Sequence, residues 1–194
     1  MLDGALVSAL VVGGGRVGTR KVGALLDAGA TVRVVALSFS PELERLPGEL
    51  TLVRAPYASE HLGDALLVVA ATSDARVNAR VAADARASGR LVNVADAPEL
   101  GNCATPAVHR SGELVVAVST GGVPSAATRI RDAIASSVGA SYGAAVGELA
   151  LLRRTLLDSG RRDRWGDASR ALIGADFCEQ VESGQFAARV AEWR

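Results

Sequence analysis

Short apolar runs alternate with amphipathic stretches through the first half of the chain. The apolar runs predict strands over residues 6–12, 31–37, 51–54, 65–71 and 91–95. Apolar positions at helical spacing predict helices over residues 17–28 and 75–87. Because strands that alternate with helices form a parallel sheet, this pattern predicts a doubly wound α/β fold of Rossmann type.

The pattern changes after Pro98. Two further strands are predicted over residues 107–110 and 113–119, with a turn between them. Pro124 suits the first turn of a helix over 125–138, because a missing N–H costs nothing at that position. From residue 142 to the end the pattern is helical, with breaks expected at Gly160, Gly166, Gly174 and Gly184.

A glycine-rich segment, VVGGGRVG, occupies residues 11–18 between the first predicted strand and the first predicted helix. Gly13, Gly15 and Gly18 fit the dinucleotide fingerprint. The first permits a tight turn, the second lets the backbone approach a pyrophosphate, and the third lets the helix pack close to the strand. The helix N-terminus would then bind the pyrophosphate. The alternative is a glycine turn in an α/β protein that binds no nucleotide.

The carboxylate that usually follows the second strand of an NAD-binding fold is missing. This strand ends Ala36-Leu37-Ser38, and the Ser38 hydroxyl is suited to a ribose hydroxyl but also tolerates a phosphate. The sequence therefore does not separate NAD from NADP. We predict that the following residues bind the cofactor: Gly13, Gly14, Gly15, Arg16, Val17, Ser38, Thr72 and Asn93.

Composition excludes several classes of partner. The 21 basic and 21 acidic residues give a formal net charge of zero, and aromatic residues make up 4% of the chain, so no nucleic-acid surface is expected. No apolar run reaches the roughly 18 residues that span a bilayer, so no membrane association is expected. Cys103 and Cys178 have neither metal-type spacing nor a disulfide framework. We therefore expect a cytoplasmic protein without a resident metal site.

Two further segments carry candidate chemistry. Asp96 follows a predicted core strand at the edge where ligands of α/β sheets bind, which suits a general base. A turn aspartate before Ala97-Pro98 is the equally weighted alternative. The loop Ser119-Thr120-Gly121-Gly122 lies between a strand and a helix, where successive N–H groups form an anion nest. A simple helix cap is slightly favoured on local grounds.

In this order the segments resemble the precorrin-2 dehydrogenase and sirohydrochlorin ferrochelatase family, the N-terminal module of siroheme synthase. The resemblance spans nearly the whole chain. The residues that carry it are 11–21, 70–81, 93–98, 106–107, 114–122, 124–134, Arg153-Arg154 and Trp165. The chain departs from the family at residues 101–105, which replace a more aromatic stretch that we expect to line the substrate pocket.

The resemblance implies an NAD-binding Rossmann-type domain over residues 1–106, a dimerisation and substrate unit over 107–141, and a helical region over 142–194. It implies NAD-dependent oxidation of precorrin-2 to sirohydrochlorin, with Asp96 as the catalytic residue. In some members it also implies insertion of ferrous iron or cobalt as a substrate. A homodimer is expected on the same ground.

A serine near the family's tetrapyrrole site aligns with Ser119. From the local sequence we infer that the backbone of Thr120, Gly121 and Gly122, with Arg110 or Arg129, holds substrate carboxylates. Three alternatives stay open: a chelatase without dehydrogenase activity, a non-catalytic module that senses the nucleotide, and a structural relative with an empty site. The missing carboxylate after the second strand disfavours the sensing module.

Overall fold

The computed structural model describes residues 2–194, and its internal contacts divide the chain into two compact units. The first unit ends at Thr105, and the second spans Pro106–Arg194. This division lies one residue before the boundary that the sequence predicts at residue 106. The three-part division of the chain stays a prediction.

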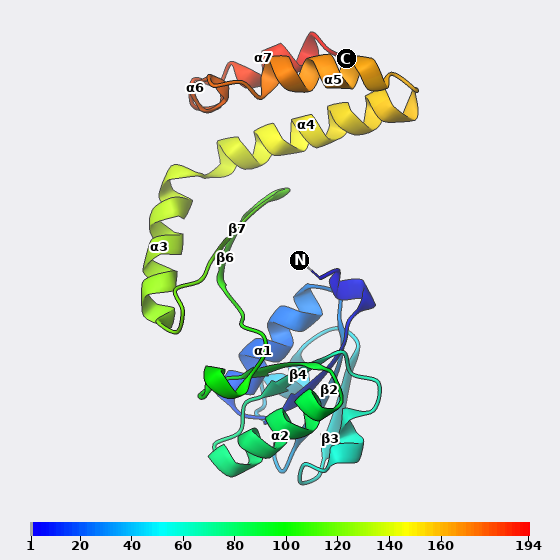
Figure 1. Ribbon diagram of the computed structural model, residues 1–194, viewed down its shortest axis with the longest axis vertical. Coiled ribbons are helices and arrows are strands. Elements are labelled where there is room, and N and C mark those ends of the chain that lie inside the picture. The colour runs from blue at the N-terminus through cyan, green and yellow to red at the C-terminus, as the bar shows by residue number, and fades with distance from the viewer. Residues whose placement is uncertain (1) are drawn as a thin grey trace. The chain divides into compact units, whose positions relative to one another are not determined.

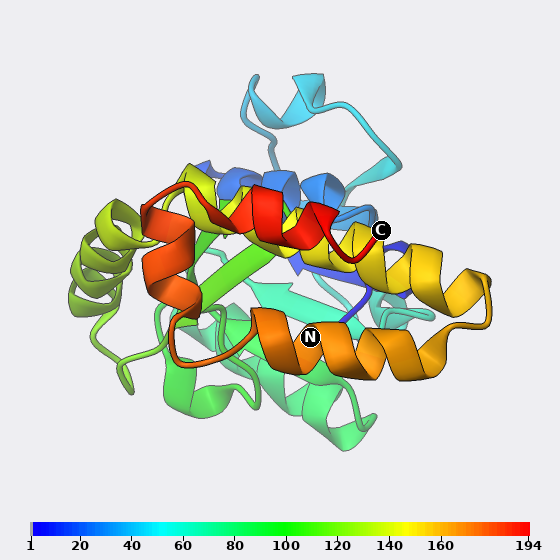
Figure 2. The same ribbon diagram turned by 90° about the horizontal axis from the view of Figure 1, so that it is seen from above.

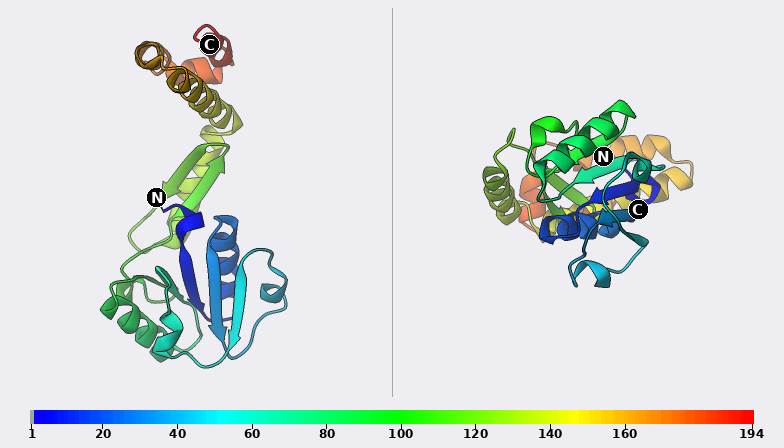
Figure 3. Two further views of the ribbon diagram at one scale, coloured as in Figure 1. Left: turned by 90° about the vertical axis from the view of Figure 1, so that its right-hand side faces the viewer. Right: turned by 90° about the horizontal axis from the view of Figure 1, so that it is seen from below.

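The first unit is built on five parallel strands (Figures 1 and 3). Across the sheet they run in the order β3 (Leu50–Arg54), β2 (Thr31–Ala36), β1 (Ser8–Val12), β4 (Leu67–Ala70) and β5 (Leu91–Val94). Two helices, α1 (Arg16–Asp27) and α2 (Ala75–Ala87), follow β1 and β4 along the chain. Because strand order reverses between β1 and β4, ligands of such a sheet bind at the carboxyl ends of these strands.

Both faces of the central strand β1 are buried. Leu10 and Val12 pack into the apolar cluster that contains Val81 of α2. The alternate residue Val11 packs into the opposite cluster, which contains Val22 of α1. A strand covered by helices on both faces is apolar throughout rather than alternating. The predicted Rossmann-type α/β fold is confirmed, and the predicted bounds of α2 agree with the structure.

The strand β5 is an edge strand of the sheet, although the sequence predicts a core strand there. Its faces are buried, which explains the apolar sequence, but its outer edge is closed by Asn102. The Asn102 side-chain oxygen accepts a hydrogen bond from the Val92 N–H at 2.7 Å, and the Asn102 N–H donates to the Val92 carbonyl at 3.0 Å. Asn102, the second residue of the segment 101–105, therefore covers the open edge of β5.

The second unit opens with an antiparallel hairpin of β6 (Ala107–Ser111) and β7 (Leu114–Val118), and α3 (Pro124–Ser137) packs on it. The remaining helices surround a separate apolar core (Figure 2). They are α4 (Ala140–Asp158), α5 (Arg162–Leu172), α6 (Phe177–Glu182) and α7 (Phe186–Ala191). Short 3-10 turns elsewhere in the chain cover Gly4–Leu6, Leu43–Arg45, Ser59–Leu62 and Pro98–Leu100.

The break predicted at Gly166 is wrong, because this residue lies inside α5. A single glycine costs a helix roughly 1 kcal/mol, and the packing of Ala168 and Leu172 in the core stabilises this helix. Gly160, Gly174 and Gly184 do lie between helices, as predicted. Within residues 2–194, no helix is both long enough and apolar enough to cross a membrane.

Neighbouring leucines of α4 give a test of this second core. Leu152 is 1% exposed and Leu151 is 47% exposed. We expect Leu152→Ala to lower the free energy of unfolding by about 2–5 kcal/mol, since it removes buried methyl groups and leaves a cavity. Leu151→Ala should change it by no more than about 0.5 kcal/mol. Urea denaturation followed by circular dichroism measures both; equal losses would contradict the assigned helix face.

Candidate functional site

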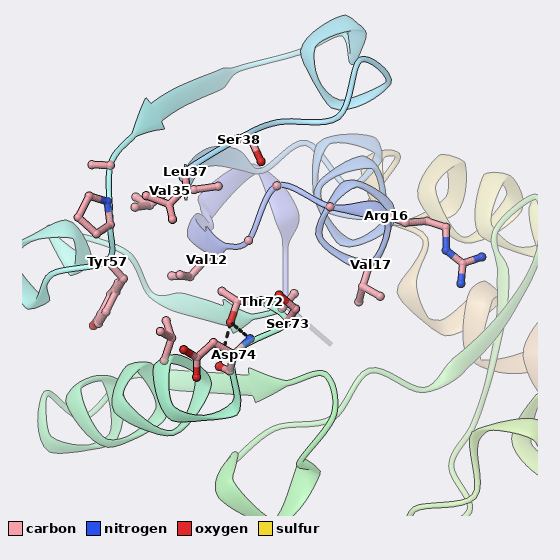
Figure 4. A pocket seen from close by; sticks show the side chains of 18 residues that line it. Val12, Arg16, Val17, Val35, Leu37, Ser38, Tyr57, Thr72, Ser73 and Asp74 are labelled. Carbon is pink, nitrogen blue, oxygen red and sulfur yellow. Dashed lines mark hydrogen bonds between the residues drawn. The ribbon is translucent and has the colours of Figure 1, made fainter.

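A pocket of about 600 Å³ lies at the carboxyl ends of β1, β2 and β4 (Figure 4). This volume is in the range of known ligand sites. The turn after β1, the end of β2 and the turn after β4 form most of its wall. The lining residues are Val12 to Val17, Val35 to Ser38, Ala55 to Tyr57, Ala71 to Asp74, and Val77.

Three of the glycines are required by the fold of the turn itself. Gly13 has a φ of +123°, and a Cβ there would lie 2.3 Å from the Ala71 carbonyl oxygen. A Cβ on Gly14 would lie 2.2 Å from the Ser38 carbonyl oxygen, and one on Gly18 would lie 2.1 Å from the Gly13 carbonyl oxygen. These glycines therefore let the backbone segments and α1 approach one another.

Gly15 is different, because the protein itself leaves room for a side chain. A Cβ there would meet no atom within 4 Å, and the backbone φ of −85° suits any residue. Gly15 is also the N-cap of α1 and supplies no side-chain cap, so the first N–H groups of the helix face the pocket region without a capping side chain. Open space beside a helix N-terminus fits the pyrophosphate of a dinucleotide.

Seven of the eight predicted cofactor residues line this pocket: Gly13, Gly14, Gly15, Arg16, Val17, Ser38 and Thr72. Asn93 does not line it. This residue is 8% exposed, its amide nitrogen donates to the Cys103 carbonyl at 3.2 Å, and its oxygen is buried without a partner in the described chain. The cofactor roles of all eight residues stay predictions.

The pocket wall formed by Ala55, Pro56 and Tyr57 is not among the predicted site residues. These residues directly follow β3, so their place at the carboxyl edge of a parallel strand was a usable signal. The Tyr57 hydroxyl donates to the Asp84 carboxylate at 3.1 Å. Burial, followed by this hydrogen bond, raises the pKa of the Tyr57 hydroxyl above its usual range.

Asp96 lies two residues beyond β5 with an exposed side chain. Its Oδ1 accepts a hydrogen bond from the Asn78 amide at 3.0 Å, and Asn78 in turn contacts the pocket residue Thr72. The carboxylate is thus linked through one amide to the wall of the pocket. Asn78 is not among the predicted site residues. A polar residue on the otherwise apolar face of α2 was a usable signal for it.

Lys21, the one lysine of the chain, contacts the segment that follows β5. Its ammonium donates to the Thr105 hydroxyl at 3.0 Å. Burial, together with the neighbouring Arg20, lowers the pKa of Lys21. Burial also raises the pKa of the Cys103 thiol, so this cysteine lacks the thiolate character of a nucleophile.

The candidate substrate residues lie in the second unit. Ser119, Thr120, Gly121 and Gly122 connect β7 to α3, with positive φ at both glycines. The Thr120 hydroxyl donates to the Val123 carbonyl at 2.6 Å, which shapes this loop. Arg110 lies on β6 and Arg129 on α3, both exposed. Their roles stay predictions.

Among residues 2–194, no three His, Cys, Asp or Glu side chains gather as metal ligands would.

Comparison with known proteins agrees with this geometry. A family model described as putative NAD(P)-binding matches residues 1–107. The siroheme synthase of Ectopseudomonas mendocina is 41% identical over 182 residues, which are 93% of this chain and 38% of that protein. That of Methylobacillus flagellatus is 39% identical over 184 residues, which are 91% of this chain and 38% of that protein.

A solved structure described as SirC, precorrin-2 dehydrogenase, matches with a TM-score of 0.78 and 29% sequence identity. The match covers 99% of this chain and 98% of that one. The strand order and the pocket thus define a Rossmann-type dinucleotide-binding protein. The chain belongs to the NAD(P)-binding family that includes the siroheme synthase N-terminal module and SirC, and it spans 38% of the length of the two siroheme synthases above.

Two glycines of the same turn give a matched test of the pocket. We expect Gly15→Val to raise the Kd for NAD at least tenfold, because the side chain would fill the space where the pyrophosphate binds. Its stability should fall by no more than about 1 kcal/mol, the size of an N-cap effect. Gly18→Ala should instead destabilise the protein, because its Cβ would collide with the Gly13 carbonyl.

Isothermal titration calorimetry with NAD and thermal denaturation separate the two effects. Unchanged nucleotide affinity in a folded Gly15→Val variant would place the pyrophosphate elsewhere.

Proposed function

We propose that this chain is an NAD-dependent precorrin-2 dehydrogenase, which oxidises precorrin-2 to sirohydrochlorin in siroheme synthesis. The observation that carries the proposal is the exposed carboxylate of Asp96, tied through Asn78 to the wall of a pocket that fits a dinucleotide. The full-length match to SirC, precorrin-2 dehydrogenase, supports the choice of substrate.

The reaction removes a hydride and a proton from the reduced tetrapyrrole. NAD+, when bound, supplies the hydride acceptor. The open space at Gly15 and the N-terminus of α1 hold the pyrophosphate, while Ser38 lies where the ribose hydroxyls are expected. The Asp96 carboxylate takes the proton as a general base. Since the side chain is exposed, a large substrate has access to it.

The carboxylates of the tetrapyrrole are assigned to the second unit. The Ser119–Gly122 loop precedes the N-terminus of α3, so its backbone N–H groups are available to an anion. Arg110 and Arg129 are exposed and form no ion pair among the described residues, so both guanidinium groups are free for a carboxylate.

The proposed enzyme is a homodimer. The hairpin of β6 and β7 pairs with no other strand in residues 2–194, and Ala127 is the one buried residue of α3. A two-stranded sheet is marginal in water by itself, and the exposed Ile130 adds apolar surface to this region. A second copy of the chain would cover these groups.

Cysteines without a disulfide fit a cytoplasmic location.

The decisive experiment is an anaerobic assay with precorrin-2 and NAD, followed by absorbance of the tetrapyrrole and of NADH. The wild-type protein should form sirohydrochlorin and NADH in equal amounts. Asp96→Asn should lower kcat by about 10²–10⁴-fold, the range for loss of a positioned base. Its fold should persist, because the new amide still accepts the hydrogen bond from Asn78.

Glu99→Gln is the matched control, since it neutralises another exposed carboxylate three residues away and should retain full activity. Near-normal turnover by Asp96→Asn would remove Asp96 from the mechanism. Absence of NADH with the wild-type protein, with NADP also inert, would refute the dehydrogenase. Ferrous iron, added afterwards, measures chelation separately.

A further inference from the structure

Asn78 is a buried polar residue on the apolar face of α2. It is 1% exposed, and its neighbours on that face, Val81 and Ala82, belong to the core between α2 and the sheet. A buried amide is costly unless its hydrogen-bonding groups find partners. An alanine at this position would make a better helix residue, so the fold of α2 by itself gives no reason for an asparagine.

The side chain of Asn78 uses all four of its hydrogen-bonding positions. Its Oδ1 faces the Thr72 N–H at 3.1 Å and the Thr72 hydroxyl at 2.8 Å. Its Nδ2 donates to the Thr72 carbonyl at 3.1 Å and to Asp96 Oδ1 at 3.0 Å. An amide offers two acceptor sites and two donors, so no capacity is left over.

The direction of these bonds is determined by the backbone of Thr72. A backbone N–H only donates and a carbonyl only accepts, so Oδ1 of Asn78 must face the first and Nδ2 the second. The group that faces Asp96 is therefore a donor, and it engages Oδ1 of the carboxylate. Within residues 2–194, the second oxygen of Asp96, Oδ2, has no hydrogen-bond partner.

We propose that Asn78 is a positioning residue, which holds the Asp96 carboxylate in register with the nucleotide pocket and leaves Oδ2 to take the substrate proton. The pocket residue Thr72 and the carboxylate are bound by the same rigid amide. The distance between the cofactor and the base therefore depends on one side chain in the core. This inference rests on the proposed function for its catalytic part.

The isosteric variant Asn78→Asp separates the two halves of this arrangement. An aspartate oxygen still accepts from the Thr72 N–H. Its other oxygen faces both Asp96 and the Thr72 carbonyl, so two hydrogen bonds are replaced by repulsion. We expect kcat to fall at least tenfold while the Kd for NAD changes less than threefold. Loss of stability alone would not produce this split between turnover and nucleotide affinity.

The pH dependence of kcat gives a second readout. In Asn78→Asp the two facing carboxylates share a proton, so the rise of kcat with pH should move to higher pH. The other charged groups on this turn are Asp74 and Arg76, which bond each other at the start of α2 and are unchanged in the variant. An unshifted profile, or an NAD affinity that falls together with kcat, would overturn the inference.

A double variant tests the contact without any assay of turnover. Asp96→Asn restores a donor opposite the new carboxylate, so the combination with Asn78→Asp reverses the polarity of the hydrogen bond. We expect thermal denaturation to show that the double variant regains part of the Tm lost by Asn78→Asp, because the repulsion at residue 96 is removed while that at the Thr72 carbonyl remains, although it stays inactive. Strictly additive losses would overturn the inference whether or not the wild-type protein oxidises precorrin-2, and inactivity of the wild type would refute only the proposed function.

Discussion

Burial of β1 on both faces is the constraint on which the rest of the first unit depends. Leu10 and Val12 pack toward α2, whereas Ala9 and Val11 pack toward α1, so neither helix can leave the sheet without exposing a central strand. Because α1 follows β1 and α2 follows β4, and both helices pack back on the sheet, the chain turns sharply at the carboxyl ends of β1 and β4. The pocket lies where those turns meet the end of β2.

The glycine turn after β1 combines two separate requirements. Gly13, Gly14 and Gly18 are needed because backbone atoms of the protein approach them too closely for a side chain. Gly15 is not needed for packing, and a Cβ there would meet no atom of the protein within 4 Å. The four-glycine pattern therefore contains three residues that the fold of the turn requires and one, Gly15, that we propose leaves room for a ligand.

Polar groups are rare inside this protein, and the two buried asparagines differ in their contacts. Asn78 is saturated by Thr72 and Asp96, so it joins two loops at the carboxyl edge of the sheet. Asn93 has a donor bond to Cys103 and a buried oxygen without a partner among the described residues. Asn78 rather than Asn93 connects the candidate base to the pocket, because only the hydrogen bonds of Asn78 reach Thr72 and Asp96. A saturated buried amide is also the more rigid of the two.

The sequence by itself determined the elements whose signal is local. Apolar strands, helix periodicity and the glycine turn predicted the α/β fold, the bounds of α2 and seven of the residues that line the pocket, because these features depend on neighbours along the chain. Packing overrode one such signal at Gly166. The tertiary structure alone decided that β5 is an edge strand, that Asn102 closes this edge, and that Asn78 contacts Asp96 eighteen positions away. Such contacts arise from the order of strands in space, and no local pattern encodes which distant residue will satisfy a buried amide.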